Sequence, residues 1–119
     1  MQSNPNQPLR FTVLHHDGIP EPHYDLLLEL PGQDPLATWQ IRISPEEWGH
    51  PGVLLSAQRI ADHRRLYLDY EGPISGHRGH VRRVATGTYT LLDQSADQWR
   101  IRLSGTVSAE LLLPAQVVK

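Results

Sequence analysis

Apolar and polar residues alternate along several short segments of the chain, which is the pattern of half-buried β-strands. The clearest case is the segment 23–30, in which Tyr24, Leu26, Leu28 and Leu30 share one face. Clusters of Gly, Pro and Asp separate such segments, as is typical of tight turns between strands. The pattern predicts strands over residues 10–16, 23–30, 39–43, 66–70, 89–92, 99–103 and 107–113.

A single segment is typical of a helix start. Ser44-Pro45-Glu46-Glu47 combines an N-cap residue, a proline at the first helical position and a capping-box glutamate. Seven or eight short strands with tight connections predict an all-β fold, a small closed antiparallel β-barrel with one short helical turn. Because side chains fill the interior of a small barrel, we expect a functional site in an outer groove or at a mouth.

Length and composition narrow the class of protein. The chain has 119 residues, enough for one domain, and we expect a flexible lead over 1–9 and a single barrel domain over 10–119. The absence of cysteine excludes disulfides, thiolate metal sites and thiol catalysis. No apolar run is long enough to cross a bilayer, and the polar N-terminus lacks a signal-peptide core. We therefore expect a cytoplasmic monomer without membrane contact.

Basic residues gather in one stretch, although the formal net charge of the chain is −2. The glycine-containing segment 76–83 is expected to be a mobile loop, and its Arg78, Arg82 and Arg83 suit the phosphates of a nucleic acid. An ordinary charged loop is the alternative interpretation.

The residues most informative about chemistry lie around the first predicted turn. His23 and Asp25 are two apart on a strand, so their side chains point to the same face, roughly 6.5–7 Å apart along the backbone. Both can converge on one ion, with His16 from the preceding strand as third ligand; His15 competes, because strand neighbours face opposite ways. Two imidazoles and a carboxylate suit Mn²⁺, Zn²⁺ or Fe²⁺ and leave positions open for substrate. A hydrogen-bonded surface pair is the alternative.

A second group of residues joins His63 and Tyr67, which lie four apart and have two arginines between them. An imidazole, a phenol and guanidinium groups together make a receptor for a phosphate. The alternative is that Asp62 and His63 cap a turn and that Tyr67 packs against its neighbours.

These motifs occur in an order that resembles a known family. The chain contains in turn His16-Asp17, His23-Tyr24-Asp25-Leu26-Leu27-Leu28-Glu29, Trp39, Asp62-His63-Arg64-Arg65-Leu66-Tyr67-Leu68-Asp69-Tyr70-Glu71-Gly72 and Arg100-Ile101-Arg102-Leu103-Ser104-Gly105. From about Phe11 to Pro114 it resembles the 3′-phosphoesterase domain at the N-terminus of bacterial DNA ligase D, the end-joining ligase. It would be a divergent, stand-alone version of that domain.

The resemblance implies a β-barrel with its active site in an outer groove. It implies a manganese-dependent activity that removes a terminal ribonucleoside and then a 3′-phosphate from a nucleic-acid primer end. His16, His23 and Asp25 fall on the family's metal ligands, which favours His16 over His15. His63 and Tyr67 fall on the histidine and tyrosine that approach the phosphate. Nucleic-acid 3′ ends are the implied partners, together with end-joining repair proteins.

The chain departs from the family at several polar positions. A phosphate-binding arginine is replaced by Leu27, and a glutamine by Leu14. The lysine that follows the tryptophan falls on Ile43, with Arg42 beside it on the opposite face. Each lost charge-assisted contact costs about 1.5–3 kcal/mol of phosphate binding. These losses keep open a second interpretation, a non-catalytic module that binds nucleic acid or a repair partner.

Overall fold

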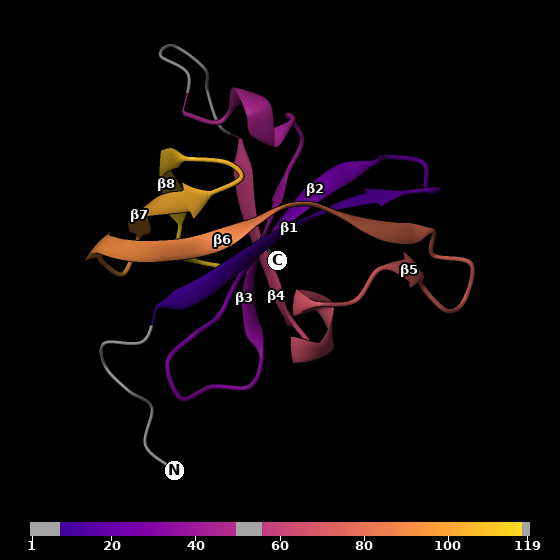
Figure 1. The fold of residues 1–119 in the computed structure, drawn as a ribbon, viewed down its shortest axis with the longest axis horizontal. Helices are drawn as coiled ribbons and strands as arrows, with labels where there is room; N and C mark the ends of the chain where they lie inside the picture. The colour runs from indigo at the N-terminus through magenta and orange to yellow at the C-terminus, as the bar shows by residue number, and fades with distance from the viewer. Residues whose placement is uncertain (1–7, 50–55, 118–119) are drawn as a thin grey trace.

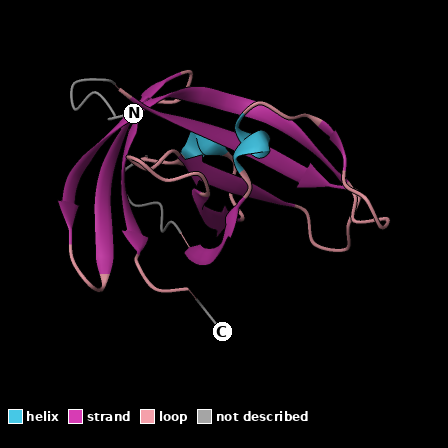
Figure 2. Cartoon of the chain, turned by 90° about the horizontal axis from the view of Figure 1, so that it is seen from below, coloured by secondary structure: helices cyan, strands magenta, loops and turns pink. Residues whose placement is uncertain are grey.

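The computed structural model describes residues 8–49 and 56–117, and nearly all of its regular structure is strand (Figures 1 and 2). The elements are β1 (Leu9–Asp17), β2 (His23–Leu28), β3 (Leu36–Ile41), the 3₁₀ turn η1 (Pro45–Glu47), β4 (Ala57–His63), the 3₁₀ turn η2 (Arg65–Leu68), β5 (Gly72–Pro73), β6 (His80–Gln94), β7 (Gln98–Gly105) and β8 (Ala109–Pro114). The all-β prediction is confirmed. Most of the predicted lead, residues 1–7, lies outside the described residues, and β1 already begins at Leu9.

The strands form one antiparallel sheet in the order β4-β3-β2-β1-β6-β7-β8, with the short β5 pairing with the outer half of β6. The sheet curls until its end strands approach each other. An isolated parallel bridge joins Arg59 of β4 to Val117, and the Arg59 guanidinium donates a hydrogen bond to the Ala115 carbonyl at 3.0 Å. The predicted barrel is therefore a curled antiparallel sheet whose ends meet at this bridge. Among the described residues there is no helix long and apolar enough to span a bilayer.

The alternation along the strands separates two apolar clusters on opposite faces of the sheet. The barrel core holds Phe11, Val13, Leu26, Leu28, Ala37, Trp39, Ile41, Trp48, Ala85, Tyr89, Trp99, Ile101, Leu103, Leu111 and Leu113. A smaller cluster, hereafter the outer cluster, holds Leu14, Leu27, Leu36, Leu68 and Val81, with Tyr67, Tyr70 and Ile74 packed against it. The segment that carries η2 and β5 covers this outer face. The candidate site lies beside the outer cluster.

β6 runs across the whole molecule, from β7 at one end to β5 at the other (Figure 1). Its pairing with β1 shifts by one residue: Val13 pairs with Ala85, but Leu14 pairs with Arg83, so Val84 is the extra residue of a bulge. Ala85 faces the barrel core, whereas Arg83 faces outward with Leu14. The bulge thus re-aims the first part of β6 toward the candidate site.

The strand predicted over 66–70 is wrong. Arg65–Leu68 form a 3₁₀ turn, closed by the Tyr67 amide donating to the Arg64 carbonyl at 3.0 Å. Only Leu68 is buried there, and its carbonyl accepts a hydrogen bond from the Thr12 hydroxyl at 3.1 Å. The alternating pattern was misleading because this segment crosses the outer face of the sheet and does not pair with a neighbour.

The predicted helical turn at Ser44 is confirmed as η1, although the Ser44 side chain makes no capping hydrogen bond. With η2 the described residues hold two short helical turns, where one was expected. The predicted loop 76–83 is shorter than expected, because β6 begins at His80. The strand β4 was not predicted, since Ala57–His63 shows no regular alternation and no residue in it is fully buried.

Tyr89 provides a test of the barrel core at alkaline pH. Its hydroxyl donates to the Glu29 carbonyl at 2.6 Å, and burial together with the Glu29 charge raises the pKa of the Tyr89 phenol to about 12. Above pH 10 the unfolded chain loses this proton first, so stability falls as the pH rises from 10 to 12, by about 2–3 kcal/mol for this group. Urea unfolding at pH 9 and pH 11.5 should show a smaller loss in Tyr89→Phe than in wild type. Equal losses would contradict the assignment.

Candidate metal centre

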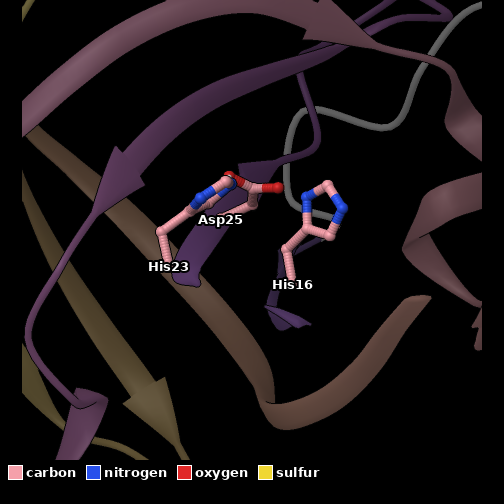
Figure 3. Close-up of side chains that lie close together, drawn as sticks. All are labelled: His16, His23 and Asp25. Atoms are coloured by element: carbon pink, nitrogen blue, oxygen red, sulfur yellow. The ribbon is translucent and has the colours of Figure 1, made fainter. Parts of the chain in front are cut away.

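Three side chains with metal-binding atoms converge at one end of the first hairpin. His16 is the second-last residue of β1, and His23 and Asp25 are the first and third residues of β2. His16 pairs with His23 across the ladder, and Leu14 pairs with Asp25. One ligand atom from each of these residues, the candidate triad, lies within 4.8 Å of the others. The three side chains point toward one another, and the rings of His16 and His23 meet edge to face with their centroids 5.0 Å apart (Figure 3). His15 faces the other side of the sheet, where its ring stacks on Tyr24 at 4.8 Å.

Asp25 is buried, with 2% of its surface exposed, and its carboxylate faces two imidazoles. Its Oδ1 lies 3.3 Å from His23 Nε2, and its Oδ2 lies 3.6 Å from Nε2 of His63. The geometry of the His23 contact is not that of a hydrogen bond, so Oδ1 has no hydrogen-bond partner among the described residues. A buried carboxylate oxygen without a partner costs free energy, and a cation is the usual compensation.

The pKa values of this cluster follow from burial and from these contacts. Burial alone would raise the pKa of the Asp25 carboxyl, but the adjacent His23 and His63 together lower it below its ordinary value. The contact with Asp25 raises the pKa of His23, against the opposing effect of burial. Asp25 is therefore an anion at neutral pH, as a metal ligand must be.

Backbone carbonyls orient all three histidines of the site. His16 Nε2 donates to the Arg78 carbonyl at 2.7 Å, and His23 Nδ1 donates to the Glu21 carbonyl at 3.0 Å. His63 Nδ1 donates to the Ala61 carbonyl at 3.2 Å. Because a carbonyl only accepts, each neutral ring carries its proton at that nitrogen, and the lone pair lies at His16 Nδ1 and at Nε2 of His23 and His63. Metal-ligating histidines are oriented in this way in known sites.

The candidate triad opens onto a pocket of about 570 Å³. Leu14, His16, His23, Asp25, Ile60, Asp62, His63, Arg64, Tyr67, Ile74, Arg78 and Val81 line it. This volume falls within the roughly 300–1,000 Å³ that small-molecule sites occupy. The pocket lies on the outer face of the sheet, where a groove was expected.

His63 and Tyr67, the second predicted group, both line this pocket. His63 is the last residue of β4, and Tyr67 lies on η2, with the two rings edge to face at 5.7 Å. The Tyr67 ring also packs against the outer cluster, so it has the packing role of the alternative interpretation in addition to its place in the pocket lining. Sequence reasoning missed Ile60 and Ile74 as pocket residues, since neither belongs to a motif and β4 was not predicted.

The four predicted phosphate-binding arginines do not form one patch. Arg78 lines the pocket, although its Nε donates to the Ser75 carbonyl at 2.7 Å. Arg42 lies near His23 and pairs with Glu21 at 3.2 Å. The other two project from opposite faces of β6. Arg83 pairs with Glu71 at 3.4 Å on the outer face, and Arg82 pairs across the ladder with His15 on the other face.

The leucines at the family's polar positions are parts of the outer cluster. Leu27 is fully buried and Leu14 is 1% exposed. Ile43 packs against the barrel core. The positions at which the resemblance implies polar phosphate contacts therefore hold packed apolar side chains and no charge.

We compared the sequence with protein-family models and with curated proteins. No protein-family model matches the sequence, and no curated protein matches it closely. The resemblance to the ligase D domain thus rests on the ordered motifs alone.

A substitution at Gly79 tests whether the hydrogen bond to the Arg78 carbonyl positions the His16 ring. Gly79 has φ +79°, and a Cβ there would collide with the backbone carbonyl oxygen of Asp17. We expect Gly79→Ala to move this loop away from His16 and to weaken metal binding about 10–100-fold, as loss of an orienting hydrogen bond does. Calorimetric titration with Zn²⁺ measures the change. The matched control is Gly76→Ala, which shares the positive φ, +78°, but meets only Arg78 Nε at 3.7 Å. Equal losses in the two variants would contradict a role specific to Gly79.

Proposed function

We propose that the protein is a metal-dependent phosphoesterase that acts on the 3′ ends of nucleic acids in DNA repair, related to the 3′-phosphoesterase domain of ligase D. One observation carries the proposal: the candidate triad lines a pocket, and a buried Asp25 oxygen has no hydrogen-bond partner among the described residues. His63 and Tyr67 line the same pocket, as the family resemblance implies.

The donor set fits a divalent transition metal. His16 Nδ1, His23 Nε2 and one Asp25 oxygen would hold the ion, with no sulfur and with positions left for substrate. Mn²⁺ is the proposed cofactor because of the resemblance, and Zn²⁺ suits the same donors. When bound, such an ion supplies Lewis-acid charge to the phosphate oxygens.

The remaining chemistry falls to side chains of the pocket. In its imidazolium form the His63 ring carries a second proton at Nε2, which can pass to a phosphate oxygen or to the leaving group, while the Ala61 carbonyl keeps the ring in place. The Tyr67 hydroxyl can donate a hydrogen bond to the phosphate. Arg64, which is exposed and pairs with no carboxylate among the described residues, can contribute a charge-assisted bond.

A second candidate is a non-catalytic module that binds nucleic acid or an end-joining repair partner. The observation that favours it is the burial of Leu14 and Leu27 in the outer cluster, at positions where the family has polar phosphate contacts. For either function, we propose that the protein is a cytoplasmic monomer.

An assay of substrate turnover distinguishes the phosphoesterase from the non-catalytic module. A labelled primer–template that ends in a 3′-phosphate, or in a single 3′-ribonucleotide, is incubated with the purified protein and Mn²⁺, and in parallel with a chelator. The phosphoesterase proposal expects a shortened or dephosphorylated product only with Mn²⁺. Absence of product from a folded protein overturns it, and retained binding of the primer–template in that case supports the second candidate.

A further inference from the structure

The pocket beside the candidate triad has two unlike halves. One half presents imidazoles and a carboxylate, and the other is apolar. The apolar wall, as we name it, consists of Leu14, Tyr67, Ile74 and Val81, all of which belong to the outer cluster or pack against it. Ile60 adds an apolar side chain from β4.

Strand pairing, a backbone hydrogen bond and ring contacts fix the side chains of the apolar wall in place. Leu14 is two residues before His16 on β1, and Val81 pairs with His16 across the ladder, because the bulge at Val84 turns this part of β6 outward. Ile74 is held by its amide, which donates to the Gly79 carbonyl at 2.8 Å. The Tyr67 ring lies between the His63 and Tyr70 rings, with centroids 5.7 Å from each.

Among the described residues, two arginines line the pocket. The arginines that line it are Arg64 and Arg78; the Arg64 guanidinium lies 5.8 Å from the Tyr67 ring centroid, and the Arg78 guanidinium donates to Ser75. The carboxylate of Asp62 also lines the pocket, and it pairs with Arg59 at 3.4 Å. Neither Arg82 nor Arg83 lines the pocket. Two guanidinium groups suit one phosphate, whereas a bound strand needs several cationic contacts along its backbone.

We propose that the pocket takes a single terminal nucleotide, with its phosphate at the candidate triad and its base packed on the apolar wall. The inference rests on the proposed phosphoesterase function and names its substrate class. Bases pack well on aromatic and aliphatic side chains, and such contacts tolerate different bases because every base has an apolar face. Binding energy then comes mainly from the terminal nucleoside, and the rest of the strand contributes little.

Three ligands test the proposal by NMR titration of the ¹⁵N-labelled protein with diamagnetic Zn²⁺: adenosine 3′-monophosphate, the abasic ribose 3-phosphate and inorganic phosphate. The nucleotide is expected to bind roughly ten-fold or more tightly than the abasic compound. Contacts between base protons and the methyl groups of Leu14, Ile74 and Val81 should appear in nuclear Overhauser spectra. Phosphates of other nucleosides should bind similarly.

A variant then localises the preference. In Ile74→Ser the ratio of nucleotide to abasic affinity should fall toward one, whereas the control Leu112→Ser, at an exposed position of β8, should keep the wild-type ratio. The comparison of the nucleotide with the abasic phosphate uses the wild-type protein, so it tests the inference even if Ile74→Ser does not fold. Equal binding of the nucleotide and the abasic phosphate overturns the inference and leaves the proposed function standing. Binding of none of the three, with or without Zn²⁺, overturns the proposed function as well.

Discussion

Replacing Asp25 by asparagine should lower the affinity for Mn²⁺ and Zn²⁺ by more than about 100-fold, because loss of an outer hydrogen-bond partner alone already costs 10–100-fold. Asparagine has nearly the same shape, so the fold is retained, but the only carboxylate of the candidate triad is lost. Titration calorimetry on the purified variant measures the metal affinity. If the proposed function holds, manganese-dependent product from the 3′-phosphate primer should disappear in parallel.

The same variant has a readout that needs no metal. The contact with Asp25 is the main reason for the raised pKa of His23. In Asp25→Asn the pKa of His23, followed by NMR in the metal-free protein, should fall toward its ordinary value near 6.5. The matched control is Asp93→Asn, at an exposed position of β6. Unchanged metal affinity in Asp25→Asn, with His23 shifted as expected, would show that the candidate triad does not bind metal.

Arg59→Ala should remove roughly 3–5 kcal/mol from the free energy of unfolding, a large part of the 5–15 kcal/mol of a typical domain. The Arg59 guanidinium packs against two tryptophan rings, 4.9 Å from the Trp39 centroid and 5.0 Å from the Trp99 centroid, and the two rings meet edge to face with their centroids 5.3 Å apart. It also donates to the Ala115 carbonyl where the two ends of the sheet meet. Desolvated cation–π contacts contribute about 2 kcal/mol, and a charged hydrogen bond about 1.5–3 kcal/mol.

Urea unfolding at neutral pH measures this loss, with Arg102→Ala as the control. Arg102 is mostly exposed and lies 3.8 Å from Glu110, so its truncation should change stability by less than about 0.5 kcal/mol. Arg59→Lys should recover only part of the loss, because an ammonium lacks the planar fork that packs on the rings and reaches the carbonyl. A loss in Arg59→Ala no larger than that of the control would mean that the sheet ends are held by other contacts.

The alternation of side chains made the strands of the first hairpin predictable. A strand has period two, so the faces of Leu26, Leu27 and Leu28 follow from the sequence once the strand is recognised. The same rule placed His23 and Asp25 on one face. It could not choose between His15 and His16, because that choice depends on how β1 pairs with β2; the register, His16 opposite His23, decides it.

Segments that gain their structure from distant partners were not predictable. Leu66 and Leu68 alternate as in a strand, but the segment forms the 3₁₀ turn η2, in which Thr12 and the outer cluster hold Leu68. β4 carries little apolar alternation and becomes a strand by pairing with β3. Arg82 and Arg83 are neighbours on β6 and therefore face opposite sides of the sheet, and the bulge at Val84 decides that Arg83 is the one on the outer face, so a basic run in the sequence does not become a basic patch.

By itself the sequence determined the fold class, the first hairpin and the residue types of the candidate triad, because these depend on local periodicity and on side-chain chemistry. The tertiary structure placed the ring of His16, which the resemblance already favoured over His15, next to Asp25. It alone decided which arginines reach the pocket and that Leu14 and Leu27 lie in a packed apolar cluster. These depend on strand register, on a single inserted residue and on burial, which are set by contacts between residues far apart in the chain.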